Sequence, residues 1–238
     1  MKKFMIKLPN NKFNKKSINK KYIFSTLTGV VLLLASLFFN FFASSYATRQ
    51  ASNSVDDILL DKLPVFDVNF IFVNGAVIFV LLIFILMITN ISQIPFILKM
   101  TALFIFIRSI SVTLTHLAPP PDMITINTDM FQKFVFGADL FFSGHVGFPF
   151  IFSLAYQHNK YLRNLFIIAS LIGATSVILG HLHYSIDVFG AYFISFTIFS
   201  LAKNIFKADY DLFLGKEAVS MSLSFESIKK VSGNMDGL

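Results

Sequence analysis

Long apolar stretches that contain no charged residue dominate the chain. Residues 22–48 and 68–98 have no charged side chain, and each stretch exceeds the roughly 20 apolar residues that cross a bilayer as a helix. The apolar stretches lack the alternation of a strand, and an open sheet edge is not tolerated in lipid. The pattern therefore predicts an all-α, polytopic membrane bundle. We expect six spans, at about 23–46, 68–89, 94–117, 140–157, 165–181 and 187–203.

Composition strengthens this interpretation and leaves little room for anything else. Of the 238 residues 55% are hydrophobic and only 14% are charged, which excludes an ordinary soluble globule. The 31 Phe residues are expected to face lipid or the bundle core. We divide the chain into a basic tail at 1–21, a six-span catalytic membrane domain at 22–205 and a polar tail at 206–238, which we expect to be poorly ordered.

The distribution of basic residues predicts the orientation. Eight Lys and no acidic residue occupy the first 21 positions. Beside a long apolar span this run is typical of a topogenic cytoplasmic tail, and not of a nucleic-acid binder. The later basic residues fall in segments that the spans place on the same side: Lys99, Lys160, Arg163, Lys203 and Lys207. By the positive-inside rule both termini are cytoplasmic, and we expect the cell membrane as the location. The first span is expected to remain as an uncleaved anchor.

Few ionisable residues lie at membrane depth, and each is a functional candidate because charge is costly there. Span three ends on the outer side, whereas spans four and six begin there, so the candidates should converge in the outer half of the membrane. They are Arg108, Asp139, His145, His181, His183 and Asp187.

These residue types fit phosphoryl transfer. His183 and Asp187 are four apart, which places them on one face of a helix. The carboxylate can hold one imidazole nitrogen and leave the other as nucleophile or base. Ser143-Gly144-His145 adds a hydroxyl, a close backbone approach and a second acid–base group. Arg108 offers a planar fork for two phosphate oxygens, so nucleophile, acid–base group and anion clamp are all present.

Each candidate also has a structural interpretation, which the sequence leaves open. Asp139 is either a helix N-cap or a carboxylate that binds a cationic head group or orients an imidazole. Ser143 and Gly144 also suit close helix packing, and Arg108 also suits a snorkelling anchor. Tyr184 is a weak candidate for substrate contact, because interfacial Tyr residues usually belong to the aromatic belt.

Three motifs resemble the sphingomyelin synthase family, a branch of the lipid phosphatase superfamily. Asp139-Leu-Phe-Phe-Ser-Gly-His145 is similar to the D-x-x-x-S-G-H motif, and His181-Leu-His-Tyr-Ser-Ile-Asp-Val188 to the H-x-H-Y-T-x-D-V motif. Arg108-Ser-Ile-Ser111, followed by Thr115, Leu117 and Pro120, resembles the R-S-I-T…T-x-L-P-x-P stretch. The resemblance covers most of residues 100–200 and implies six spans, no metal and no cofactor.

The departures from these motifs bear on the reaction. Lipid phosphatases usually carry an Arg six residues before the second catalytic His, where this chain has Val177. The sphingomyelin synthase branch also lacks that Arg, which favours a transferase and makes Arg108 the substitute clamp. Val146 and Ser185 replace Thr residues, Ala138 replaces a Gly, and the family's closing Tyr-His is absent after Phe199.

The resemblance implies an enzyme that moves phosphocholine or phosphoethanolamine from a glycerophospholipid to a lipid hydroxyl such as ceramide. The catalytic residues would be His145, His183 and Asp187. The substrate-binding residues would be Arg108, Asp139, Ser143, Gly144 and Tyr184. A lipid phosphatase or phospholipase-C-like hydrolase is the alternative enzyme, and a non-catalytic scaffold is the third interpretation. The partners are the donor and acceptor lipids in the membrane, with no nucleic acid, and a homo-oligomer stays open.

Overall fold

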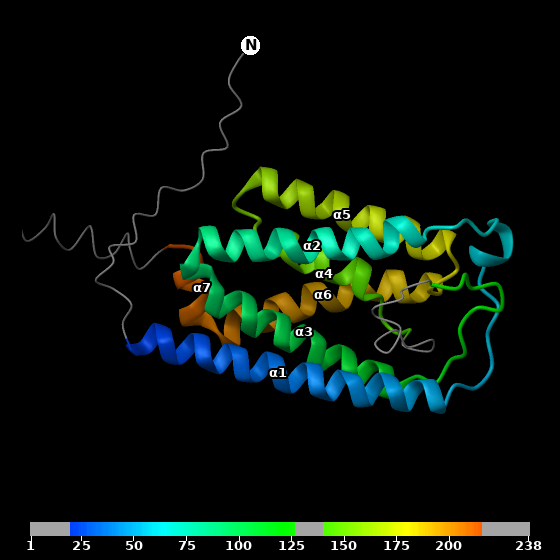
Figure 1. Cartoon of the computed structure of the whole chain (residues 1–238), viewed down its shortest axis with the longest axis horizontal. Helices are drawn as coiled ribbons and strands as arrows, with labels where there is room; N and C mark the ends of the chain where they lie inside the picture. Colours follow the sequence, from blue (N-terminus) through cyan, green and yellow to red (C-terminus); the bar gives the residue numbers. More distant parts are fainter. Residues whose placement is uncertain (1–19, 127–139, 216–238) are drawn as a thin grey trace, which may run out of the picture.

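The computed structural model describes residues 20–126 and 140–215, and these residues form a bundle of helices without strands (Figure 1). Within the described residues, five helices are long and apolar enough to cross a membrane. They are α1 (Lys20–Arg49), α2 (Asn69–Thr89), α3 (Ile94–Leu114), α5 (Lys160–Leu179) and α6 (Ser185–Ile205). The prediction of an all-helical, polytopic membrane bundle is confirmed.

The fourth predicted span differs from the others, and the expectation of a full-length helix over 140–157 is wrong. Helix α4 runs only from Gly144 to Ala155 and has 12 residues. At about 1.5 Å per residue it covers roughly 18 Å, well short of the roughly 30 Å hydrocarbon core. Residues 140–143 before it are not helical. Such a backbone is tolerated at membrane depth where protein surrounds it, and Phe142 and Ser143 are both completely buried.

The chain after α6 also departs from expectation, because part of the polar tail is ordered. Residues Lys207–Phe213 form α7, in which Tyr210 and Phe213 are buried. Their rings pack on that of Phe96 in α3, with centroids 4.9 and 5.4 Å apart. These two aromatic side chains bury apolar surface that a count of polar residues does not register. Two single-turn 3₁₀ helices complete the elements, η1 (Leu60–Lys62) and η2 (Ile91–Gln93).

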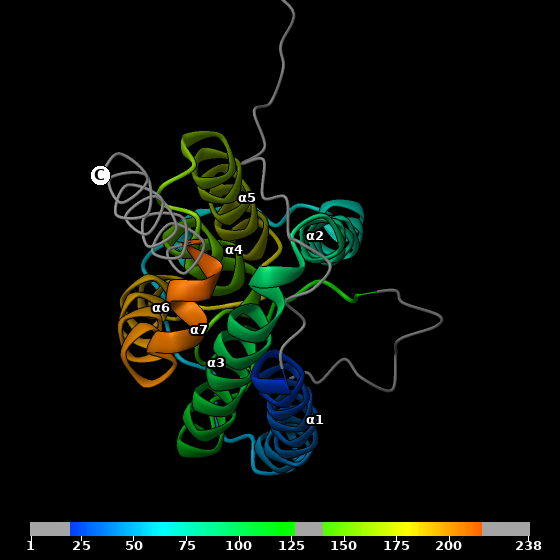
Figure 2. The same ribbon diagram turned by 90° about the vertical axis from the view of Figure 1, so that its left-hand side faces the viewer.

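The helices differ in how much protein surrounds them. Helix α1 packs along α3, and α4 packs against both α5 and α6. The end-on view places α1 and α2 at the edge of the bundle (Figure 2). Large side chains on these two helices point outward, as with Phe24, Phe70 and Ile88, which are each more than two-thirds exposed. Such apolar exposure fits a lipid-facing surface.

Helix α4 owes its internal position to close contacts with its neighbours. A Cβ atom at Gly147 would lie 2.8 Å from both the Phe104 ring and the Ser195 hydroxyl, so α3 and α6 approach α4 more closely than a side chain would allow. The connecting segments meet at one end of the bundle, where Ser52 N–H donates to the His116 carbonyl (2.7 Å) and Phe66 N–H to that of Leu179 (2.8 Å). We call this end, formed by residues 50–68, 115–126 and 180–184, the loop end; α7 lies at the opposite end (Figure 1).

Candidate active site

The centre of the candidate site is a buried histidine–aspartate pair at the loop end. Asp187 lies in the first turn of α6 and is completely buried. Its Oδ2 accepts the Tyr184 N–H at 3.0 Å and lies 3.3 Å from Nδ1 of His183. A helix N-terminus favours a negative charge, and a buried carboxylate needs such partners. With Nδ1 beside Asp187, Nε2 of His183 is the nitrogen left for chemistry.

The pair forms for a different reason than the sequence spacing indicated. Spacing of four predicted that both residues share one face of a helix, but α6 begins only at Ser185. His183 lies in the turn before the helix. Asp187 reaches back from the third helical position, as acidic residues in N-terminal capping arrangements do. The contact was predicted correctly, and its helical origin was wrong.

A backbone hydrogen bond joins the two histidine segments. The Ser143 N–H donates to the carbonyl oxygen of Asp187 at 3.3 Å, so the start of α4 lies beside the start of α6. Ser143 is the N-cap of α4, but its hydroxyl makes no capping bond. This buried oxygen has no hydrogen-bond partner in the described part of the chain, and the same is true of Oδ1 of Asp187.

His145 occupies the first turn of α4, between α2 and α5. Its ring stacks on that of Phe72, with centroids 3.7 Å apart and planes inclined by 24°. On the other side a Cβ atom at Gly173 would lie 2.4 Å from the His145 carbonyl oxygen, so the backbone of α5 touches that of α4 here. His183 and Arg108 both lie within electrostatic reach of the His145 imidazole. The structure thus brings the two predicted catalytic histidines into one site.

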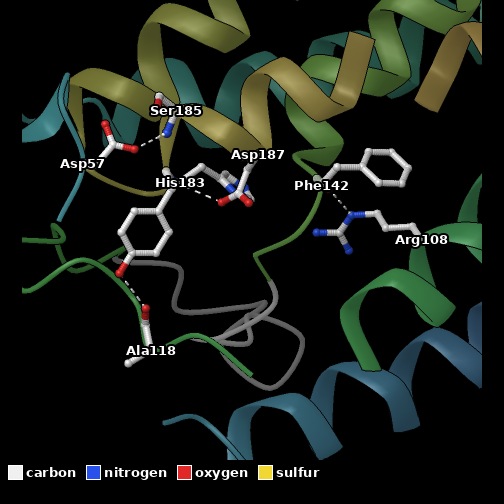
Figure 3. A network of polar contacts seen from close by, with 8 residues as sticks. Asp57, Arg108, Ala118, Phe142, His183, Ser185 and Asp187 are labelled. Carbon is white, nitrogen blue, oxygen red and sulfur yellow. Dashed lines mark hydrogen bonds and ion pairs between the residues drawn. The ribbon is translucent and has the colours of Figure 1, made fainter. Parts of the chain in front are cut away.

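Arg108 reaches the same site from α3. Its Nε donates to the carbonyl oxygen of Phe142 at 2.9 Å, across 34 residues of sequence. A Cβ atom at Gly144 would lie 3.6 Å from the same nitrogen, so the guanidinium lies beside the first residue of α4. Figure 3 shows this guanidinium pointing back toward His183 and Asp187. A planar cation held beside the start of α4, within electrostatic reach of His145, is suited to hold phosphate oxygens.

Two other predicted substrate-binding residues have different outcomes. Asp139 lies outside the described residues. Tyr184 is buried, and its hydroxyl donates to the Ala118 carbonyl at 2.9 Å and accepts the Val55 N–H at 3.3 Å. Its phenol therefore joins three segments of the loop end. Substrate contact by Tyr184 stays a prediction.

Sequence reasoning missed the part played by Asp57. Its Oδ2 accepts the N–H of Ser185, the first residue of α6, at 2.7 Å, while Oδ1 accepts those of Leu59 (2.9 Å) and Leu60 (3.3 Å). Figure 3 shows its carboxylate beside Ser185 at the start of α6, with the His183–Asp187 pair between it and Arg108. Burial would raise the pKa of Asp57, but these N–H donors outweigh burial and leave the pKa below its usual value. The segment Asp57-Ile-Leu-Leu60, which leads into η1, indicates a local cap. Nothing in the local sequence identifies Ser185, 128 residues away, as a further partner of Asp57.

The described residues contain no group of three or more His, Asp or Glu side chains placed to hold a metal ion. Chemistry without a metal stays a prediction. What the site contains is a tautomer-fixing carboxylate, two imidazoles and a guanidinium, which together suit nucleophilic attack on phosphorus.

Part of the chain is similar to a known protein family. Residues 137–205 match the family model described as PAP2 superfamily C-terminal. This segment contains both histidines and Asp187, and its similarity to that superfamily indicates an enzyme that processes lipid phosphates. No curated protein and no solved structure matches the chain at a significant level.

Proposed function

We propose that this protein transfers a phospho-head group from a glycerophospholipid to the hydroxyl of a second lipid. The observation that carries the proposal is the buried contact between His183 Nδ1 and Asp187 Oδ2 at 3.3 Å. It fixes the ring and directs Nε2 away from the carboxylate, as a nucleophilic imidazole requires.

The reaction has two steps. In the first, Nε2 of His183 attacks phosphorus, the bond to the diacylglycerol oxygen breaks, and protonated His145 gives that oxygen its proton. In the second, His145 takes a proton from the acceptor hydroxyl. The resulting oxygen attacks phosphorus, and the phosphorus–nitrogen bond to His183 breaks. Arg108 holds the phosphate oxygens throughout, where a preorganised charge is effective because little water is present.

The acceptor distinguishes the two enzyme proposals. Similarity to the PAP2 superfamily supports a hydrolase equally well, in which water replaces the second lipid. The absence of an Arg at position 177, where lipid phosphatases usually carry one, favours transfer. Val177 is completely buried, and its carbonyl oxygen accepts the His183 N–H at 3.4 Å, so an uncharged side chain occupies this position next to the site.

Lipid analysis separates these alternatives. The purified protein is incubated in mixed micelles with labelled phosphatidylcholine or phosphatidylethanolamine, with and without ceramide. A transferase produces labelled sphingolipid only when ceramide is present. A hydrolase releases labelled phosphate or phospho-head group in either case, and a scaffold gives neither product. His183→Ala should abolish any activity, whereas His158→Ala, an exposed position beyond the end of α4, serves as the matched control.

We also propose that the loop end faces away from the cytoplasm. The chain has no Cys, so single cysteines report accessibility without background. Because Asp57 is buried, its neighbour Ile58, which is 70% exposed, reports on this segment. Cysteines at Ile58, Met123 and Ser185 should react with an impermeant thiol reagent in intact cells. Cysteines at Asn10, His158 and Gly215 should react only after permeabilisation. The reverse pattern would place the site on the cytoplasmic side.

A further inference from the structure

A cavity lies at the loop end, on the turn that carries His183. It has a volume of about 370 Å³, which is within the usual range for sites that bind small ligands. Its walls come from residues 54–57, 60, 61, 63–65 and 120–122, together with His181 and Tyr184. The turn that carries His183 therefore forms one wall, although His183 itself does not line the cavity.

The wall of this cavity carries negative charge only. Among the described residues, no Lys or Arg lines it and four aspartates do: Asp56, Asp57, Asp61 and Asp122. Asp57 is occupied by the three N–H groups described above. Within residues 20–126 and 140–215, the side chains of the other three form no hydrogen bond or ion pair. Three carboxylates around one cavity that have no partner in the described part of the chain attract a cation.

His181 provides a second, independent indication of a ligand. It lines the same cavity, only 4% of its surface is exposed, and its Nε2 has no hydrogen-bond partner among the described residues. It also has a φ of 51°, in the left-handed region that a residue other than glycine rarely adopts. Buried polar atoms are normally paired. His181 thus lines the cavity and carries a buried ring nitrogen without a partner in the described chain, a hydrogen-bonding group left for a ligand.

The kind of cation follows from the lining. Quaternary ammonium groups are bound by cages of aromatic rings. Among the described residues, Tyr184 is the one Phe, Tyr or Trp in this wall, and its hydroxyl is already bonded to Ala118. Carboxylates and an imidazole nitrogen instead suit a primary ammonium, which has three N–H donors. The aspartates are not arranged with other residues as a metal site in the described chain.

We infer that this cavity, which we name the acidic pocket, binds a primary ammonium group in preference to a quaternary one. That the ammonium belongs to an ethanolamine phospholipid rests on the function proposed above. In such a head group one oxygen and two carbons separate phosphorus from nitrogen, and the pocket shares the turn 181–184 with the proposed nucleophile.

Binding is tested without any enzymatic assay. Val65→Cys places a thiol in the pocket wall, and Ile58→Cys places one on the same loop but outside the wall, at a 70% exposed position. At each position we compare the labelling rate of the cationic 2-aminoethyl methanethiosulfonate with that of the anionic sulfonatoethyl reagent. We expect the ratio of the two rates to be about tenfold higher at position 65 than at position 58. Free ethanolamine should slow labelling at position 65 only, and choline should do so more weakly.

The triple variant Asp56→Asn, Asp61→Asn and Asp122→Asn should lose both the charge preference and the protection by ethanolamine. Its melting temperature in detergent is compared with that of the parent, and Asp61→Asn alone is used if the triple variant unfolds. Equal labelling by both reagents, with no protection by ethanolamine, would overturn the acidic pocket. Protection by choline as strong as that by ethanolamine would overturn the preference for a primary ammonium.

Donor lipids then distinguish a lipid head group from a free amine. If the head group occupies the pocket, the triple variant should show about a tenfold higher KM for phosphatidylethanolamine with kcat retained, and the effect should be confined to donors that carry a primary amine. Protection by ethanolamine together with an unchanged KM assigns the pocket to a free amine and overturns the lipid source. If no lipid is turned over at all, the proposed function fails, while the labelling result still decides the pocket.

Discussion

The two ends of the bundle each contain a buried polar cluster, and the clusters differ in how fully their atoms are paired. Near α7, Lys99 Nζ donates to Asp209 Oδ2 (2.6 Å) and to the Ser25 hydroxyl (2.7 Å), and Ser25 in turn donates to the other oxygen of Asp209. At the loop end, the Ser143 hydroxyl and one oxygen of Asp187 are buried without a partner in the described chain.

This difference separates a structural role from a chemical one. The cluster of Ser25, Lys99 and Asp209 joins α1, α3 and α7, and each charge in it is satisfied within the protein. The site at the loop end keeps buried polar atoms unpaired, at a cost of about 1–3 kcal/mol each. Such a cost is tolerated where function requires it. Breaking the cluster near α7 should therefore lower the stability of the protein, whereas breaking the cluster at the loop end should lower its activity.

The largest expected effect is on activity, from His183→Ala. Loss of the nucleophile should prevent phospho-enzyme formation and lower transfer by about 10³-fold or more. His145→Ala should also be slow with a phospholipid, because the leaving oxygen lacks its acid. A donor with a nitrophenyl leaving group needs little protonation, so it should restore phospho-enzyme formation in the His145 variant alone. Phospho-enzyme is measured by trapping the labelled enzyme. Equal restoration in both variants would mean that the two roles are wrongly assigned.

The next effect is on stability, from Lys99→Ala. Asp209 would remain largely buried without its cation, and removal of one partner of a buried pair costs about 3–5 kcal/mol. The melting temperature in detergent should fall clearly, while the protein that stays folded keeps its activity. Lys99→Met combined with Asp209→Leu removes both charges and should recover most of the loss. A double variant as unstable as the single one would contradict a simple ion-pair role.

A smaller and pH-dependent effect is expected from Asp57→Ala. The variant loses the cap on the first turn of α6, which costs about 1–2 kcal/mol. Because the folded pKa of Asp57 lies below its usual 3.8, the carboxylate stabilises the fold fully above that value, and the contribution is lost as the pH falls through the lower folded pKa. The difference in melting temperature between parent and variant should thus be constant near neutral pH and shrink below about pH 3.8. A difference that persists unchanged in acid would point to packing instead of charge.

Removal of divalent metal ions is expected to have no effect on activity, which makes it the smallest effect in this series. The proposed steps use imidazoles, a carboxylate and a guanidinium only, so incubation with EDTA should leave the rate of transfer unchanged. Loss of activity that Mg²⁺ or Ca²⁺ restores would overturn this mechanism, whereas it would not bear on the Lys99–Asp209 pair.

The sequence by itself determined the helical membrane architecture and the residues that meet in the site. Apolar stretches of sufficient length have few alternatives to a helix in lipid, because each backbone polar group must be satisfied within its own segment. The alternation of spans also placed Arg108, His145 and His183 at one end of the bundle. These properties are local, or follow from counting crossings, so they can be read along the chain.

Only the tertiary structure decided how α4, His183 and Asp57 are used. Hydropathy did not show that α4 is a short helix enclosed by α3, α5 and α6, since burial in protein and burial in lipid select the same apolar residues. It did not show that His183 precedes α6, because the contact with Asp187 depends on where the helix begins. The link from Asp57 to Ser185 spans 128 residues. No local pattern encodes such a partner, because the partner is chosen by the packing of segments that are distant in the chain.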